Sequence, residues 1–124
     1  MLASAPMTPL VGTMKPEAAK AFYGDVLGLK FINDDGFALV FEGKNGRIRV
    51  SRVPAVTPPA YAVLGFTVDD INKAVDGLAA KGVVFARFGF LPQDARGVWS
   101  APDGTKVAWF HDPDLNLLSI VQHV

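Results

Sequence analysis

Two stretches of the chain place apolar residues at the spacing of an amphipathic helix. In each stretch the apolar residues stand three or four positions apart, which places them on one face of a helix, and a glycine follows shortly after the last of them. Pro16 suits the first turn of the first helix, and Gly28 suits its C-terminal cap. Asp69 or Asp70 suits the start of the second helix, and Gly82 its end. The apolar positions are Ala19, Phe22, Tyr23, Val26 and Leu27 in the first helix, and Ile71, Ala74, Val75, Leu78 and Ala79 in the second.

Extended apolar segments precede and follow each predicted helix. An Asn-Gly pair at Asn45-Gly46 predicts a hairpin between two of them. Both halves therefore run in the order strand, helix, three strands, which indicates a tandem repeat of a βαβββ unit. One such unit cannot bury both faces of its sheet, so we expect the two copies to pack or pair. The predicted strands are 8–13, 29–32, 37–42 and 47–53 in the first half and 61–68, 83–85, 106–111 and 117–122 in the second, with an additional strand at 97–101.

Composition narrows the class of protein. The chain has 124 residues, and its 12 basic and 12 acidic side chains balance, so no basic stripe for nucleic acid is expected. Cysteine is absent, which excludes disulfides and thiolate chemistry. No apolar run reaches the ~20 residues that span a bilayer, and the N-terminus lacks the basic and apolar regions of a signal peptide. We expect one cytoplasmic domain over residues 1–124 with no membrane partner: module one at about 7–53, a proline-rich connector at 54–60, and module two at about 61–122.

Five short motifs, taken in order, resemble those of the vicinal oxygen chelate superfamily, which includes glyoxalases, bleomycin resistance proteins and extradiol dioxygenases. The resemblance runs from about Thr8 to Val121. It implies an α+β fold in which paired βαβββ modules form a curved mixed sheet around a cleft, with the helices outside, and it implies a homodimer. Leu115 departs from the pattern, because the family often has glycine in that turn. The motifs are Ala21–Leu29, Val68–Ile71, Ala80–Phe85, Pro102–Gly104 and Phe110–Asp114.

The resemblance also implies where a metal would be held. Enzymes of the family bind a divalent metal through four side chains, and the matching positions here are Thr8, Arg49, Val63 and Ser119. None of these is a good ligand for a divalent cation, and the Arg49 guanidinium would repel one. The only histidines, His111 and His123, do not restore the ligand set. We therefore expect no metal and no cofactor, whereas catalytic residues and enzymatic activity remain open.

Without a metal, the predicted cleft suits a small organic ligand, anionic or aromatic. Arg49 either pairs with a ligand carboxylate or phosphate or makes an ordinary surface ion pair, and the two tryptophans either line the cleft or pack in the core. The lining candidates are Thr8, Arg49, Ser51, Val63, Thr67, Trp99, Trp109 and Ser119, with Gly65, Phe88, Phe90, Phe110 and Leu117 beside them.

Three functions are compatible with this picture. The leading hypothesis is a metal-independent small-molecule binding protein similar to the bleomycin resistance branch. The alternative is a metal-dependent lyase, isomerase or dioxygenase with a non-standard site. A third is a subunit that keeps the fold for dimerisation. Retained stoichiometric metal would favour the second, and a cleft filled by its own side chains would favour the third.

Overall fold

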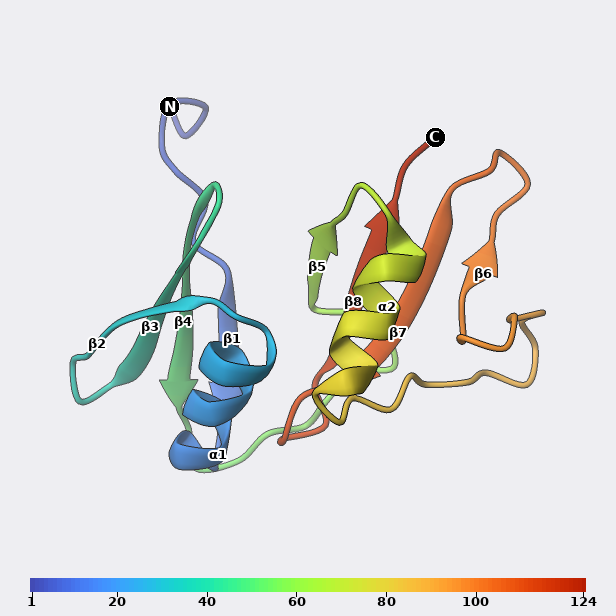
Figure 1. Cartoon of the computed structure of the whole chain (residues 1–124). Helices are drawn as coiled ribbons and strands as arrows, with labels where there is room; N and C mark the ends of the chain where they lie inside the picture. The colour runs from blue at the N-terminus through green and yellow to red at the C-terminus, as the bar shows by residue number, and fades with distance from the viewer. The chain divides into compact units, whose positions relative to one another are not determined.

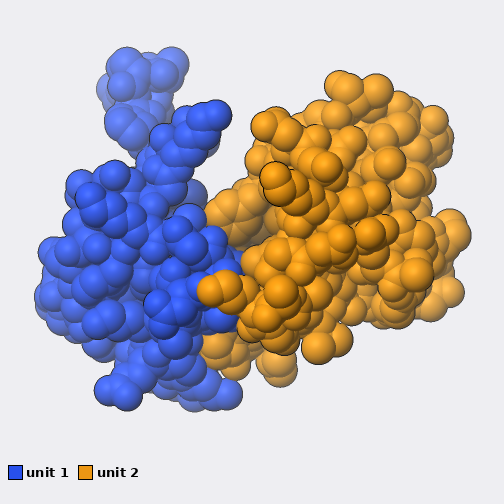
Figure 2. All heavy atoms as spheres, in the orientation of Figure 1, with its two compact units in different colours: residues 1–57 blue, residues 58–124 orange.

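A computed structural model describes residues 1–124. The chain forms two compact units, Met1–Thr57 and Pro58–Val124, which Figure 2 shows in separate colours. The division between them lies inside the proline-rich segment that follows the first four strands. None of the helices has the length and apolarity that crossing a membrane requires.

The first unit is a four-stranded sheet with the strand order β1-β4-β3-β2 (Figure 1). Strands β1 and β4 are parallel, and the other neighbours are antiparallel. The predicted Asn-Gly hairpin is confirmed, since Gly43 pairs with Gly46 and leaves Lys44 and Asn45 as its loop. The elements are β1 (Leu10–Thr13), α1 (Pro16–Ala21), η1 (Phe22–Val26), β2 (Lys30–Asp34), β3 (Ala38–Gly43) and β4 (Gly46–Arg52).

The first helix widens before it ends. After α1, the π-helical turn η1 begins, and the backbone N–H of Leu27 donates to the carbonyl of Phe22 at 2.9 Å. Gly28 then ends the helix at a φ of +76°, as its position predicted. The buried Tyr23 ring lies 5.9 Å from the Phe41 ring of β3, so the apolar stripe of the helix packs on one face of the sheet.

The second unit repeats this topology with the strand order β5-β8-β7-β6, and β5 is parallel to β8. Helix α2 lies against β7 and β8 (Figure 1). Asp70 caps the helix, because its carboxylate accepts the Lys73 backbone N–H at 3.1 Å. The predicted tandem βαβββ repeat is therefore confirmed. The elements are β5 (Leu64–Thr67), α2 (Ile71–Ala80), β6 (Trp99–Ser100), β7 (Lys106–His111) and β8 (Leu117–Gln122).

The predicted strand at 83–85 is wrong. Residues 83–85 join no ladder, and the bond to β7 is made by the next residue, whose Ala86 N–H donates to the Trp109 carbonyl at 2.8 Å. The edge of β7 pairs instead with β6, so the additional strand predicted at 97–101 is the one that completes the sheet. The apolar pattern of this segment has a different cause: the centroid of the Phe85 ring lies 5.7 Å from that of the buried Phe110, so Phe85 is apolar because it packs against this ring.

Each sheet has one apolar face that meets its helix. In β4 this face carries Ile48 and Val50, and in β8 it carries Leu118 and Ile120, all of them buried. Successive side chains of a strand point to opposite faces, so Arg49 and Ser119 lie on the faces away from the helices. Those two outer faces hold the residues from which a ligand site would be built.

Candidate functional site

On the second sheet, the outer face is centred on Ser119. Its register partners are Gly65 on β5 and Trp109 on β7, so the three residues lie side by side on one face. Val63 and Thr67 stand two residues on either side of Gly65 and therefore share that face. Ser119 is 8% exposed, and a Cβ atom at Gly65 would lie only 3.1 Å from its Oγ. The glycine thus lets β5 approach the Ser119 hydroxyl closely.

Four aromatic rings form a continuous row beside Ser119, which we call the aromatic row: Phe90, Phe88, Trp109 and Trp99. Phe88 meets Trp109 nearly edge-on, with ring centroids 5.4 Å apart and planes at 87°. Phe90 lies 5.8 Å from Phe88, and Trp99 lies 6.3 Å from Trp109. Both tryptophans are half-buried, and Phe90 is 80% exposed. The row therefore presents ring surface outward instead of being enclosed in the core.

The loop that carries Phe88 and Phe90 is fixed by one side chain, Gln93. Its Oε1 accepts the Phe88 N–H at 2.8 Å, and its Nε2 donates to the carbonyls of Ala86 at 2.9 Å and Gly97 at 2.8 Å. The role of Gln93 is not predictable from the sequence, because a glutamine in a segment without periodicity gives no signal. Its three hydrogen bonds hold Phe88 against Trp109 without a strand ladder.

An ion pair joins the same loop to helix α2. Arg96 donates to both carboxylate oxygens of Asp76, at 2.9 and 3.1 Å. The Arg96 guanidinium holds the pKa of Asp76 below its ordinary value. Although both side chains are exposed, the bidentate geometry ties the loop to a rigid element.

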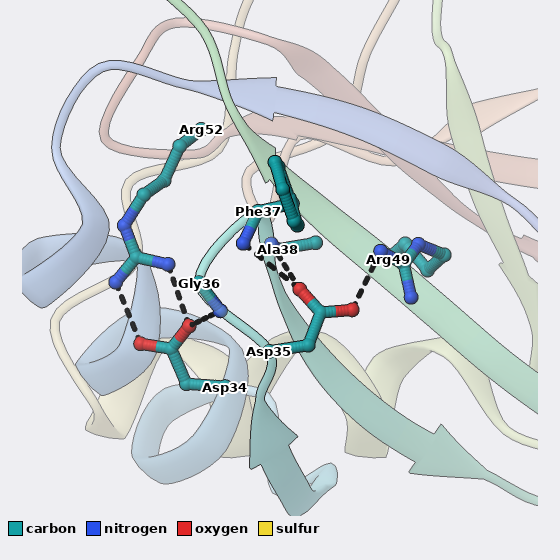
Figure 3. Close-up of polar contacts among 7 residues, drawn as sticks. All are labelled: Asp34, Asp35, Gly36, Phe37, Ala38, Arg49 and Arg52. Atoms are coloured by element: carbon teal, nitrogen blue, oxygen red, sulfur yellow. Dashed lines mark hydrogen bonds and ion pairs between the residues drawn. The ribbon is translucent and has the colours of Figure 1, made fainter.

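On the first sheet, the outer face is charged. Arg49 lies in register between Leu10 of β1 and Val40 of β3, and its Nη2 donates to Asp35 Oδ2 at 2.8 Å (Figure 3). The other carboxylate oxygen, Oδ1, accepts two backbone N–H groups of the β2–β3 turn. The pKa of Asp35 is lowered first by the backbone N–H of Ala38 and next by Arg49. Thus Arg49 makes the intramolecular ion pair that was one of its two predicted roles.

The neighbouring aspartate points to the opposite face. Asp34 accepts both Nη groups of Arg52 at 2.6 Å and the Gly36 backbone N–H at 2.9 Å (Figure 3). The Arg52 hydrogen bonds, followed by that of Gly36, lower the pKa of Asp34 to about 2. Nothing in a single sequence says which distant arginine each of these two consecutive aspartates meets.

The remaining predicted residues are spread over both units. Thr8 is exposed and precedes β1, and Ser51 pairs with Gly12 and Ala38 on the face of Arg49. Val63 is 38% exposed, and its backbone N–H donates to the Leu117 carbonyl. Trp109 and His111 share the face of Ser119, and His111 is exposed at the end of β7.

The four positions that would bind a metal do not offer suitable ligands. Thr8 and Ser119 supply hydroxyls, Val63 has no donor atom, and Arg49 is a cation held by a carboxylate. Across residues 1–124, no group of three histidine, aspartate or glutamate side chains is arranged to hold a metal ion. The side chains of these four positions therefore do not fit a divalent metal.

Known proteins share both the sequence pattern and the fold. Residues 8–120 match the model of the Glyoxalase/Bleomycin resistance protein/Dioxygenase superfamily. A solved member of that superfamily from Sphaerobacter thermophilus is similar with a TM-score of 0.76 and 19% identity, over 99% of this chain and 100% of the other. Lactoylglutathione lyase from Agrobacterium tumefaciens is similar with a TM-score of 0.73 and 19% identity, over 98% and 96%. No curated protein sequence matches the chain.

Proposed function

The chain belongs to the glyoxalase/bleomycin resistance protein/dioxygenase superfamily, and from this premise we propose that it is a metal-independent binding protein for a small organic molecule. The ligand is an aromatic compound that packs against the aromatic row of the second unit. The observation that carries this proposal is the row itself: two half-buried tryptophans on the outer face of a sheet, extended by the loop residues Phe88 and Phe90, of which Phe90 is exposed.

The chemistry of this face supports an aromatic ligand. Covering exposed ring surface with another ring is favourable because it buries apolar area, and edge-to-face or offset stacking adds about 0.5–1.5 kcal/mol per pair beyond that burial. Gln93 and the Arg96–Asp76 pair hold the loop in place, so little ordering is required when the ligand binds. Binding sites commonly combine such an apolar surface with a few polar groups, here the Ser119 hydroxyl.

Tryptophan fluorescence provides a direct test, because Trp99 and Trp109 are the only tryptophans of the chain. Phenol and benzoate serve as aromatic probes, and cyclohexanecarboxylate serves as a matched probe without an aromatic ring. We expect saturable quenching by at least one aromatic probe, unchanged by EDTA, and weaker quenching by the cyclohexane compound. Absence of saturable quenching by both aromatic probes would overturn the proposal, as would binding that disappears with EDTA.

A pair of variants locates the binding surface. Phe90 and Phe37 are almost equally exposed, at 80% and 79%, but they belong to different units. Phe90→Ala removes the outer ring of the row and should weaken probe binding several-fold. Phe37→Ala is the matched control and should leave it unchanged. Equal effects of the two substitutions would place the binding surface elsewhere.

Membership of the superfamily also supports a homodimer as part of the proposal. Light scattering after gel filtration should then give a mass twice the 13.2 kDa of the chain. A mass of one chain at micromolar concentration would contradict the dimer and would remove the hypothesis that the fold is kept for dimerisation.

A further inference from the structure

Two arginines of β4 meet two consecutive aspartates in different ways. Arg52 uses both of its Nη groups on Asp34, with two bonds of 2.6 Å on the helix face of the sheet. Arg49 makes one hydrogen bond, from Nη2 to Asp35, on the outer face (Figure 3). A guanidinium carries five N–H donors. Asp34 takes a donor from each Nη group of Arg52, whereas Asp35 takes one donor of Arg49 and leaves its Nη1 and Nε groups without this partner.

The Arg49 guanidinium is nevertheless held in place. Its partner Asp35 is fixed by two backbone N–H groups, from Phe37 at 2.9 Å and from Ala38 at 2.8 Å, on the oxygen that does not face the arginine. Strand β4 is an interior strand of the sheet, and the Arg49 side chain is 36% exposed between Leu10 and Val40. A charged group anchored in this way loses little conformational freedom when it binds a second partner.

We propose that Arg49 is an oxyanion-binding residue that takes a carboxylate or phosphate group through the N–H donors that Asp35 leaves free, with Asp35 as its positioning residue. This goes beyond the proposed function and does not rest on it, because the site lies in the first unit and does not include the aromatic row. Arginine is suited to this role, since its planar fork matches the oxygens of both groups.

Asp35 also determines the strength of the site. Its negative charge cancels part of the Arg49 charge, so a free oxyanion is expected to bind weakly and with strong dependence on ionic strength. The same charge sets selectivity, because it repels every anion and only an anion that forms directional hydrogen bonds with the guanidinium offsets that repulsion. Oxyanions should therefore bind better than chloride at equal ionic strength.

The test uses the full chain and NMR of the arginine Nε–Hε groups. Acetate and inorganic phosphate are titrated separately, with chloride at matched ionic strength as the control. The five arginines of the sequence are assigned from single Arg→Gln variants. We expect a saturable shift of the Arg49 signal that exceeds those of Arg47, Arg52, Arg87 and Arg96, and the tighter of the two anions identifies the oxyanion class.

The substitution Arg49→Gln should abolish the tightest anion binding, measured as loss of the saturable shifts at neighbouring backbone amides. Arg52→Gln is the matched control, and it should leave the anion affinity unchanged within about twofold, since its fork is occupied by Asp34. No saturable shift of Arg49 in the unmodified protein would overturn the proposal, as would equal shifts at all five arginines. Neither outcome bears on phenol quenching of the tryptophans, so the two proposals fail separately.

Discussion

The two units share one topology but present opposite chemistry on their outer sheet faces. In the first unit, Arg49 stands beside Val40 and is paired with Asp35. At the corresponding place in the second unit, Ser119 stands beside Trp109. The helix-facing positions are apolar in both, because each sheet must bury one face against its helix. The repeat is therefore maintained by the buried positions, and the outer positions are free to carry different binding chemistry.

The strand that follows the helix in each unit differs in length, and this is a second difference between the units. In the first unit this strand, β2, has five residues, whereas β6 in the second has two. The long segment before β6 satisfies its backbone through Gln93 and Asp94 side chains instead of a ladder. The shorter strand thereby leaves a loop that delivers Phe88 and Phe90 to the aromatic row.

The largest effect is expected at the two equivalent core rings. Phe41 on β3 and Phe110 on β7 are both fully buried and lie in register with Ile48 and Leu118. Replacing either by alanine leaves a cavity and should lower the free energy of unfolding by about 3–5 kcal/mol. Urea denaturation measures the loss, and Phe37→Ala is the exposed control. If one of the two substitutions lowered the unfolding free energy by less than about 1 kcal/mol, the two rings would not be equivalent in their cores.

The hairpin turns of the two units provide the next comparison. The β3–β4 turn is a two-residue loop, whereas the β7–β8 turn is organised by Asp112, which accepts the backbone N–H groups of Asp114 and Asn116 and the Asn116 side-chain amide, all at 2.9 Å. Asp112 is 4% exposed, so Asp112→Ala should cost about 1–3 kcal/mol in unfolding free energy. Asn45→Ala in the short loop should cost less, and the opposite ranking would contradict this account.

A gain in stability is expected in the same wide turn. Leu115 has a φ of +67°, a left-handed conformation that disfavours residues with a Cβ atom, and it is 65% exposed. Leu115→Gly should therefore raise the unfolding free energy by about 1 kcal/mol. The reverse change at Gly82, where φ is +94°, should lower it by a similar amount when alanine is introduced. Thermal unfolding of both variants measures the two shifts, and a loss of stability in Leu115→Gly would show that its side chain matters more than its backbone.

The smallest effect is the pH dependence of the ion pairs. The pKa of Asp34 is lowered to about 2 in the folded protein, against about 3.9 in an unfolded chain. A lowered carboxyl pKa stabilises the fold above the unfolded value, and this stabilisation is lost as the pH falls from about 4 through about 2. Arg52→Gln should move the Asp34 midpoint up towards its ordinary value, which carbon NMR of the carboxyl measures. Asp103 is the internal control, because the Thr105 backbone N–H lowers its pKa independently of Arg52.

The βαβββ repeat, and the sheet face on which the strand side chains lie, could be predicted from the sequence. In the sequence Arg49 alternates with Ile48 and Val50, and Ser119 alternates with Leu118 and Ile120; in the structure the four apolar residues are buried, and Arg49 and Ser119 lie on the outer faces. Segments whose structure depends on side-chain contacts between residues distant in sequence could not be predicted. Phe85 resembles a strand residue in the sequence, although it lies in an irregular segment and its half-buried ring packs against Phe110. Gln93 organises a loop through hydrogen bonds that no periodicity reveals.

The candidate site was predictable to a similar extent. Trp99 and Trp109 were expected near Ser119, and the register brings all three to one sheet. The partner of Arg49 was not predictable, because Asp35 is 14 residues away in sequence and its direction depends on the alternation of β2. The left-handed backbone at Leu115 gives a physical reason for the glycine that the family often has in this turn.

The central claim is that this chain keeps the superfamily fold without a divalent metal, and bound metal per chain tests it most directly. The protein is incubated in turn with Ni, Co, Mn, Zn or Fe(II), dialysed exhaustively and analysed for its elements. We predict that none of these metals is retained at a stoichiometric level, because Thr8, Arg49, Val63 and Ser119 offer no suitable set of ligands. Retention of one metal ion per chain or per dimer would contradict this, and lyase, isomerase and dioxygenase activities would then be the ones to assay.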